Sequence, residues 1–173
     1  MKGFQGDDLS KPNTILACAK HFAAYGAPQA GRDYHTVNMG EEELRNVYLP
    51  PFKAAVDAGV ETFMTAFNEI NGVPATANKF IFQDILRKEW GFNGFVVTDY
   101  TAINELVPHG FAKDEKHAAQ LALEAGVDMD MMSGANRLYL KELVKENKID
   151  ESLIDEACKR ILLAKYKLYT YEL

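Results

Sequence analysis

The sequence has 173 residues, of which 47% are hydrophobic and 25% are charged; this balance excludes a disordered or fibrous chain and is typical of one globular domain. A formal net charge of −6 argues against nucleic acid or an anionic membrane as a partner, because phosphates are bound by clustered Lys and Arg. No apolar stretch reaches the roughly 18 residues of a membrane span, and the first ten residues lack the apolar core of a signal peptide.

Short apolar runs alternate with helical patterns along the chain. The expected strands are 15–22, 61–67, 94–100 and 127–131, and the expected helices are 44–59, 79–90, 115–126, 136–146 and a long one capped by Asp150. Pro50 and Pro51 cannot lie inside the first helix, so we expect a break there, with the second piece starting at a proline. Segment 68–78 is expected to be a polar loop.

This alternation predicts βαβ units, and therefore an α/β fold with a parallel sheet. The last three expected strands recur about every 33 residues, which is the spacing of a (β/α) barrel. A doubly wound sheet fits the same pattern equally well. The pattern contains four βα units, whereas a closed barrel requires eight, so on pattern alone the chain looks like half of a larger structure; if the sheet is a barrel, it is a partial TIM-type barrel with C-terminal helices.

Polar residues follow each expected strand, at the sheet edge where α/β proteins bind ligands. They are Lys20 and His21, Asn68 and Glu69, Asp99 and Tyr100, and Asp128 with Asp130. Each has a structural alternative. Asp99 can be a helix N-cap, and neighbours such as Lys20 and His21 face opposite sides of a strand. For Asp128 and Asp130, capping or ion pairing with the next helix is favoured over chemistry.

The other candidate residues also have structural interpretations. Arg32 and Asp33 are more typical of a surface ion pair, and Tyr25, Tyr34, Phe67 and Tyr100 are expected to pack, although aromatic faces beside polar groups also suit sugars. Two cysteines that lie far apart in the sequence, Cys18 and Cys158, predict neither a disulfide framework nor a metal site. We expect both to be buried free thiols.

Four stretches carry a resemblance that covers almost the whole chain, from about Gly6 to Leu168. They are KHFAAYG followed by GRDYHTVN, then LPPFKAAVDAGVETFMTAFNEINGVPATAN, LRKEWGFNGFVVTDY and AGVDMDM. In this order and at these spacings they resemble glycoside hydrolase family three, and most of all its bacterial β-glucosidase branch. The resemblance implies that residues 1–173 form the C-terminal half of a (β/α)8 barrel domain, with the other half and a following domain outside the chain.

The resemblance also implies an activity and a set of site residues. Family members hydrolyse β-linked sugars with retention, so Asp99 is expected to be the nucleophile for terminal β-D-glucosyl residues. Lys20 and His21 match a pair that hydrogen-bonds sugar hydroxyls, and Met64 and Phe67 match residues that line the glucose subsite. No metal or organic cofactor is implied, because this hydrolysis needs only a carboxyl pair.

The resemblance also covers residues around the sugar subsite. Arg32 and Tyr34 fall in a loop that approaches the mouth of the pocket. Tyr100 follows the expected nucleophile, where Trp or His is usual, and this departure affects the preference for the aglycone. The implied partner of all these residues is a β-linked oligosaccharide or glycoside.

Several alternatives stay open. In this branch the acid/base is a Glu from a domain after the barrel, so we expect the isolated chain to be nearly inactive. The β-N-acetylglucosaminidase branch uses an Asp-x-His pair, which Asp33-Tyr34-His35 would supply, but Ala23 and Ala24 begin the stretch where that branch has Pro-Gly-His. β-Xylosidase activity is a neighbouring possibility. A non-catalytic half-barrel that forms a homodimer through its exposed sheet edge is a rival of another class.

Overall fold

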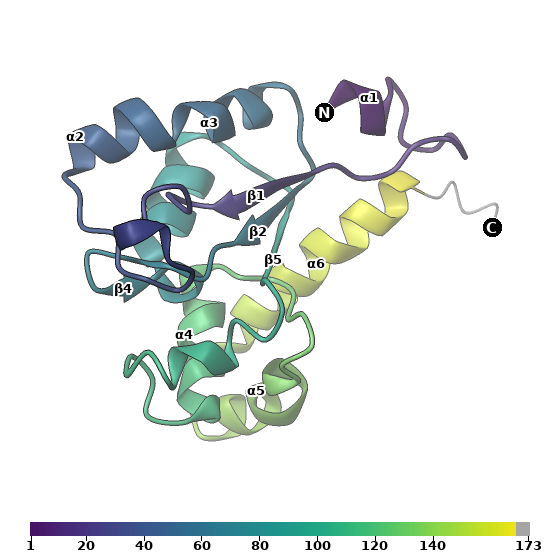
Figure 1. The fold of residues 1–173 in the computed structure, drawn as a ribbon. Helices are drawn as coiled ribbons and strands as arrows, with labels where there is room; N and C mark the ends of the chain where they lie inside the picture. The colour runs from purple at the N-terminus through teal and green to yellow at the C-terminus, as the bar shows by residue number, and fades with distance from the viewer. Residues whose placement is uncertain (169–173) are drawn as a thin grey trace.

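The computed structural model describes residues 1–168. At its centre lies a sheet of three parallel strands in the order β1-β2-β5, beside a separate antiparallel hairpin, β3-β4 (Figure 1). The strands are β1 (Cys18–Phe22), β2 (Thr62–Thr65), β3 (Glu69–Ile70), β4 (Val73–Pro74) and β5 (Phe95–Val97). The parallel pairing confirms the α/β fold class predicted from the sequence.

Helices connect and follow these strands. The α-helices are α1 (Lys2–Gln5), α2 (Glu41–Glu43), α3 (Pro50–Asp57), α4 (Glu115–Ala125), α5 (Ala135–Lys145) and α6 (Glu151–Leu168). The π-helices are η2 (Leu44–Tyr48) and η4 (Phe80–Glu89), and short 3-10 turns form η1 (Gln29–Gly31), η3 (Ala75–Ala77) and η5 (Asn104–Leu106). As expected, the broken helix resumes at Pro50, and Asp150 caps α6 by accepting a hydrogen bond from Ser152 N, 2.8 Å away.

The predicted fourth strand, 127–131, is wrong. Within residues 1–168 this segment makes one isolated parallel bridge, between Val97 and Met129, and no strand. The reason is that the Asp128 side chain takes a ladder position: its Oδ2 accepts the hydrogen bond from Val96 N at 2.8 Å, where a neighbouring strand would offer a carbonyl. The predicted loop 68–78 in turn contains the hairpin β3-β4 and the turn η3.

The core lies between the sheet and the helices that cover it. Phe22 of β1 and Phe63 of β2 are fully buried, with ring centroids 5.2 Å apart. Phe22 also packs edge-on against Phe52 of α3 and tilted against Phe82 of η4. Aromatic rings from two strands and two helices therefore meet in one cluster, which fixes α3 and η4 against the same face of the sheet.

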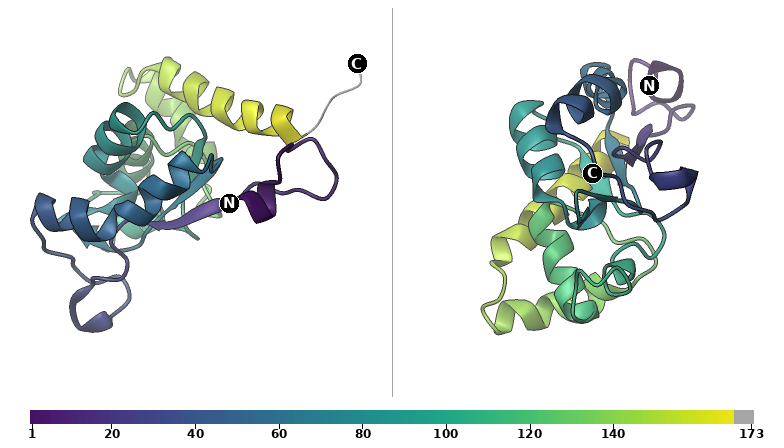
Figure 2. Two further views of the ribbon diagram at one scale, coloured as in Figure 1. Left: turned by 90° about the horizontal axis from the view of Figure 1, so that it is seen from above. Right: turned by 60° about the vertical axis from the view of Figure 1, so that its left-hand side comes forward.

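The N-terminal segment is attached to the sheet through one buried side chain. Gln5 Nε2 donates to Gly59 O at 2.8 Å, while Gln5 Oε1 accepts from Ala17 N and Glu61 N. These partners precede β1 and β2, so Gln5 joins the starts of both strands. The far end of α6 lies close to this segment, as Figures 1 and 2 show, and Lys167 Nζ reaches Glu61 Oε1 at 2.8 Å.

Both cysteines are exposed, so the expectation of buried thiols is wrong. Cys18 begins β1, which pairs with β2 on one side and has no partner on its other side within the described chain. Cys158 lies on the exposed face of α6, among the exposed side chains of Leu162 and Tyr166. A sequence pattern reports that a residue is apolar, but the position of a sheet edge depends on the assembled fold.

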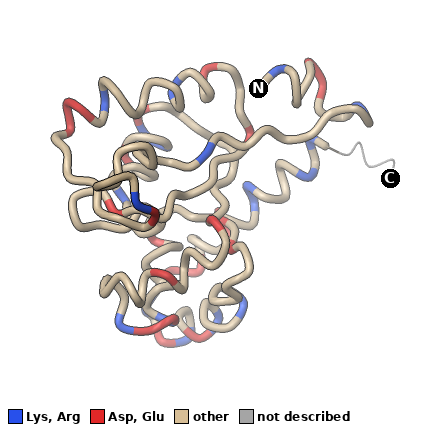
Figure 3. The backbone as a smooth tube through the Cα atoms, in the orientation of Figure 1, with Lys and Arg blue, Asp and Glu red and all other residues tan. Residues whose placement is uncertain are grey.

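The charged residues are distributed without a strong local excess of either sign around α4 and α5, where acidic and basic positions are interspersed (Figure 3). Among the helices of residues 1–168, none combines the length and apolarity that crossing a membrane requires.

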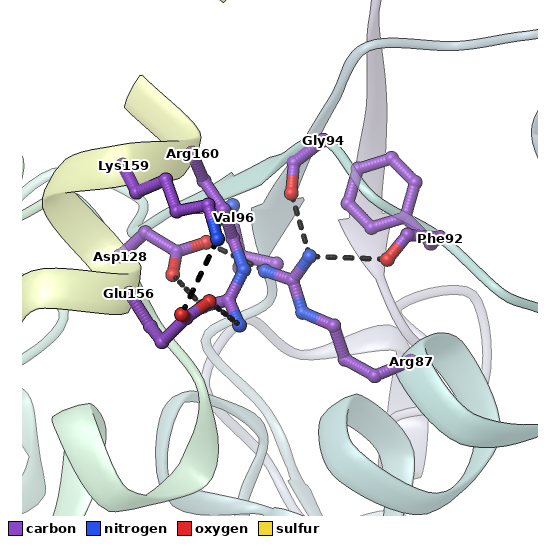
Figure 4. Close-up of polar contacts among 8 residues, drawn as sticks. All are labelled: Arg87, Phe92, Gly94, Val96, Asp128, Glu156, Lys159 and Arg160. Carbon is purple, nitrogen blue, oxygen red and sulfur yellow. Dashed lines mark hydrogen bonds and ion pairs between the residues drawn. The ribbon is translucent and has the colours of Figure 1, made fainter. Parts of the chain in front are cut away.

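The buried carboxylate of Asp128 contacts three elements, β5, η4 and α6 (Figure 4). Asp128, whose side chain is 1% exposed, contacts Arg87 Nη2 of η4 at 2.6 Å and Arg160 Nη1 of α6 at 2.8 Å, in addition to Val96 N. Arg87 Nη1 also donates to Gly94 O at 2.6 Å. A buried charge is tolerated only when it is paired and hydrogen-bonded, so these contacts hold β5, η4 and α6 in one arrangement.

Removing the Asp128 charge is therefore expected to destabilise the fold strongly. Asp128→Asn leaves the Arg87 guanidinium buried without its counter-charge, and we expect a loss of about 3–5 kcal/mol in the free energy of unfolding. Urea denaturation followed by circular dichroism measures this loss. The matched control is Asp84→Asn, because Asp84 pairs with Lys88 on an exposed helix face and should contribute only about 0.5 kcal/mol. Equal effects of the two substitutions would contradict this assignment.

Candidate active site

The end of β1 is irregular where the candidate pair Lys20–His21 lies. Ala19 pairs with Phe63 and Phe22 with Thr65, so β1 advances by three residues while β2 advances by two. The register between the two strands therefore shifts by one residue between these pairs, as it does at a β-bulge, and such irregularities re-aim side chains near functional sites. Lys20 is exposed, whereas His21 is half-buried and points toward Asp99.

Asp99 leaves the end of β5 and is held from several directions. Its Oδ2 lies 3.3 Å from His21 Nε2, and its Oδ1 accepts a hydrogen bond from Tyr100 N at 2.7 Å. Asp99 N donates to Thr65 Oγ1 of β2, 3.2 Å away. Within the described chain, Tyr100 N is the one backbone donor to this carboxylate, which is not the pattern of a helix N-cap. The side chain is 17% exposed, so the carboxylate is both fixed and accessible.

The residue before Asp99 is fixed on the other side. Thr98 is fully buried, its N–H donates to Met129 O at 2.9 Å, and its Oγ1 accepts from Met131 N at 2.8 Å. The strand end is thus clamped between β2 and the segment that carries Asp128. Asp130 caps the start of α5 by accepting from Asn136 N, which supports its structural interpretation.

The surroundings of His21 lower the pKa of its imidazole and so favour its neutral form. Burial is the main cause that lowers the pKa of His21, and the positive charge of Lys20 lowers this pKa further. The carboxylates of Asp99 and Asp33 act in the opposite direction and raise it. A neutral ring protonated at Nε2 can donate a hydrogen bond to Asp99 or to a sugar hydroxyl without introducing a charge.

An aromatic wall stands beside this pair. Phe67 lies 4.6 Å from Tyr34 and 6.5 Å from Tyr25 between ring centroids, and Tyr25 meets His21 edge-on at 5.5 Å. Burial raises the pKa of Tyr34, and the carboxylates of Glu105, Asp33 and Asp99 raise it further. Aromatic rings and acidic groups therefore lie close together beside His21, a combination that suits the apolar faces and hydroxyls of a sugar.

In the described chain, the side chains of the remaining candidates form no hydrogen bond or ion pair with the Asp99 carboxylate. Met64 is half-buried on β2 opposite Val97, and Arg32 is exposed beside a hollow of about 290 Å³ that Tyr25 also lines. Tyr100 is 57% exposed. In residues 1–168 neither the Arg32 guanidinium nor the Tyr100 hydroxyl forms a hydrogen bond or ion pair with Asp99. The structure therefore brings together His21, Asp99 and the Phe67 wall, and leaves Arg32 and Tyr100 at the periphery.

Other carboxylates and the second histidine of this region have different partners from Asp99. Asp33 and His35 are exposed, and Asp33 Oδ1 accepts a hydrogen bond from Tyr34 N. Glu69 Oε1 accepts from the Thr36 hydroxyl at 2.5 Å, so this carboxylate fastens the loop between β1 and α2. In the part of the chain described, no group of three or more His, Cys, Asp or Glu side chains is arranged to bind a metal ion.

Sequence reasoning missed the two threonines that lie behind the carboxylate. Thr65 accepts from Asp99 N, and Thr76 of η3 donates its hydroxyl to Thr65 Oγ1 at 3.0 Å. Both are buried. Threonine is common on strands for packing reasons alone, so only the register between β2 and β5 would have identified Thr65 as a partner of Asp99.

The opposing charges around His21 make a prediction about its titration. Asp99→Asn removes a charge that raises the pKa of His21, so this pKa should fall, whereas Lys20→Gln should raise it. NMR titration of the imidazole C–H signals measures both shifts. Asp33→Asn serves as the control, because Asp33 contributes less to the pKa than Asp99 and its removal should produce a smaller fall. An unchanged pKa in Asp99→Asn would contradict the contact between the two side chains.

Proteins of known structure and known activity resemble this chain closely. The crystal structure of β-glucosidase from Listeria innocua superposes with a TM-score of 0.94 at 46% sequence identity, covering 96% of this chain and 24% of that chain. That enzyme has also been solved in complex with glucose, and a mutant of it with laminaribiose.

Curated relatives agree with this likeness. The periplasmic β-glucosidase of Salmonella typhimurium is 42% identical over 168 residues, which are 97% of this chain and 22% of the relative. The β-xylosidase of Formosa agariphila is 40% identical over 99% of this chain and 25% of the relative. The chain thus spans about a quarter of the length of these relatives. Residues 1–164 match the family model of the glycosyl hydrolase family 3 N-terminal domain, and the chain therefore belongs to this family.

Proposed function

We propose that this chain supplies the nucleophile for retaining hydrolysis of terminal β-D-glucosyl residues. The observation that carries this proposal is the Asp99 carboxylate, which lies at the carboxyl end of a parallel strand, fixed by Tyr100 N and His21 yet accessible to solvent. Glycosidases place a carboxylate in this way to attack the anomeric carbon. The similarity to β-glucosidases supports the choice of substrate.

The proposed reaction proceeds in two displacements. An Asp99 oxygen bonds to the anomeric carbon while the glycosidic C–O bond breaks, and an acid protonates the departing oxygen. The group that acted as the acid then deprotonates a water molecule. This water attacks the anomeric carbon, breaks its bond to Asp99 and releases the sugar with retained configuration. Neutral His21 and charged Lys20 bind sugar hydroxyls in this scheme, and Met64 and Phe67 line the sugar subsite.

The outer residues are proposed to contact the leaving part of the substrate. The side chains of Tyr100 and Arg32 are exposed and would lie beside a leaving sugar or alcohol in this proposal. Because these two side chains form no hydrogen bond or ion pair with Asp99 in the described chain, their substitution should alter aglycone preference more than the chemistry of the glycosyl unit.

We also propose that the three parallel strands are part of a (β/α)8 barrel and that the acid/base lies outside this chain. The unpartnered side of β1 is where a further barrel strand would pair. The chain spans about a quarter of the length of its relatives. The remaining length of those relatives is enough for the rest of a barrel and for a domain that supplies the acid. Retaining enzymes hold the two carboxyl groups about 5–5.5 Å apart.

Covalent labelling tests the role of Asp99. We expect the chain to gain one fluoroglucosyl group from 2,4-dinitrophenyl 2-deoxy-2-fluoro-β-glucoside, because this leaving group needs little acid assistance. Asp99→Asn should abolish the adduct, whereas Asp33→Asn, which changes another carboxylate near His21, should retain it. Intact-mass spectrometry measures the adduct, and circular dichroism verifies that each variant is folded.

Two results would count against this proposal. An adduct that persists in Asp99→Asn would exclude Asp99 as the nucleophile. Faster labelling by the corresponding 2-fluoroxyloside would favour the second candidate, a β-xylosidase, which the Formosa agariphila relative supports.

We further propose that the isolated chain self-associates through the open edge of β1, because unpaired strand edges recruit other strands. Light scattering after size exclusion should show a mass that rises with concentration. Cys18→Asp, which places a charge on this edge, should shift the chain toward the monomer, whereas Cys158→Asp on α6 should not. The opposite response of the two variants would assign the contact to α6.

A further inference from the structure

The Asp99 backbone is anchored to the neighbouring strand by a side chain rather than by strand pairing alone. Asp99 N donates to Thr65 Oγ1 at 3.2 Å, just beyond the last registered pair of β2 and β5, Met64 with Val97. The Thr65 side chain is fully buried. The hydroxyl thus continues the connection between the strands past the point where their ladder ends.

A second hydroxyl fixes the first. Thr76 Oγ1 donates to Thr65 Oγ1 at 3.0 Å, and Thr76 is also buried, on the turn η3 that follows the hairpin. Thr65 Oγ1 therefore accepts from two donors, one on each side, which uses both of its lone pairs. With these contacts made, rotation of the Thr65 side chain away from Asp99 would break both hydrogen bonds, of which the one from Thr76 is buried.

We propose that Thr65, oriented by Thr76, is a positioning residue for the Asp99 carboxylate. Thr65 holds the amide at one end of Asp99, while Tyr100 N and His21 hold the two carboxylate oxygens. Releasing the amide lets the residue rotate, and this moves the carboxylate relative to His21 and to the anomeric carbon of a bound sugar. The catalytic consequence of this inference rests on the proposed role of Asp99 as the nucleophile. The positioning of Asp99 by Thr65 does not depend on that role.

Substitutions of Thr65 can separate positioning from stability. Thr65→Val keeps the shape of the side chain and removes the hydroxyl, and Thr65→Ser keeps the hydroxyl. The matched control is Thr62→Val, because Thr62 is also buried on β2 and its hydroxyl donates to Ala17 O at 2.9 Å, at the end of the strand remote from Asp99. Thr62→Val removes one buried hydrogen bond in this strand, whereas Thr65→Val removes both of the hydrogen bonds that Thr65 Oγ1 accepts.

Two NMR readouts follow Asp99 directly in the ¹⁵N-labelled chain. Loss of its acceptor should speed hydrogen exchange of the Asp99 amide about tenfold in Thr65→Val, relative to the Thr98 amide. The pKa of His21 should fall in the same variant, because the carboxylate that raises it has moved. Thr65→Ser and Thr62→Val should retain the exchange rate and the pKa of the unmodified chain.

Labelling by the activated fluoroglucoside supplies the catalytic readout. We expect Thr65→Val to form the adduct about tenfold more slowly per folded molecule, since small misplacements of reacting groups cost this much or more. Thr65→Ser should restore most of the rate, and Thr62→Val should leave it unchanged.

Each outcome decides between the alternatives. Unchanged exchange and an unchanged His21 pKa in Thr65→Val would overturn the inference, as would equal changes in Thr62→Val. If the unmodified chain forms no adduct, the activity proposed for this chain fails, and the two NMR measurements still decide whether Thr65 positions Asp99.

Discussion

The Asp128 carboxylate is the constraint on which the arrangement of the second half of this structure depends. It is buried and charged, and such a group requires donors from every side. They come from three separate elements: Arg87 of η4, Arg160 of α6 and the backbone of Val96 in β5. Satisfying one carboxylate therefore sets where two helices lie against β5, the strand that leads to Asp99.

The candidate active site follows from this constraint by rigid connections. Val96 is held by Asp128, Thr98 by the backbone that follows Asp128, and Asp99 by Thr65 of the neighbouring strand. These contacts fix the backbone on both sides of Asp99, so its side chain starts from a defined position. In β1, His21 lies within the register shift between Ala19 and Phe22, and its Nε2 reaches the Asp99 carboxylate. A reactive carboxylate benefits from this arrangement, because preorganisation avoids reordering groups during reaction.

The sequence predicted the parts of this arrangement that depend on local patterns. Alternating apolar runs and helical periods predicted the parallel sheet, and Pro50 and Asp150 marked helix starts correctly. Segment 127–131 was mispredicted because its apolar residues look like a strand, whereas the Asp128 side chain takes one position of the backbone ladder and leaves only an isolated bridge. The bulge beside His21 and the contact of Thr65 with Asp99 depend on the register between strands distant in sequence, which no local pattern contains.

Cys18 is an exposed thiol on the open edge of β1, so its chemical reactivity reports whether this edge is covered. A thiol there is available to alkylating reagents while the edge is uncovered, and a strand that pairs with β1 would shield it. Cys158, exposed on α6, supplies an internal reference in the same chain. The ratio of modification at the two thiols therefore records how much of the edge is covered, in whatever assembly the chain forms.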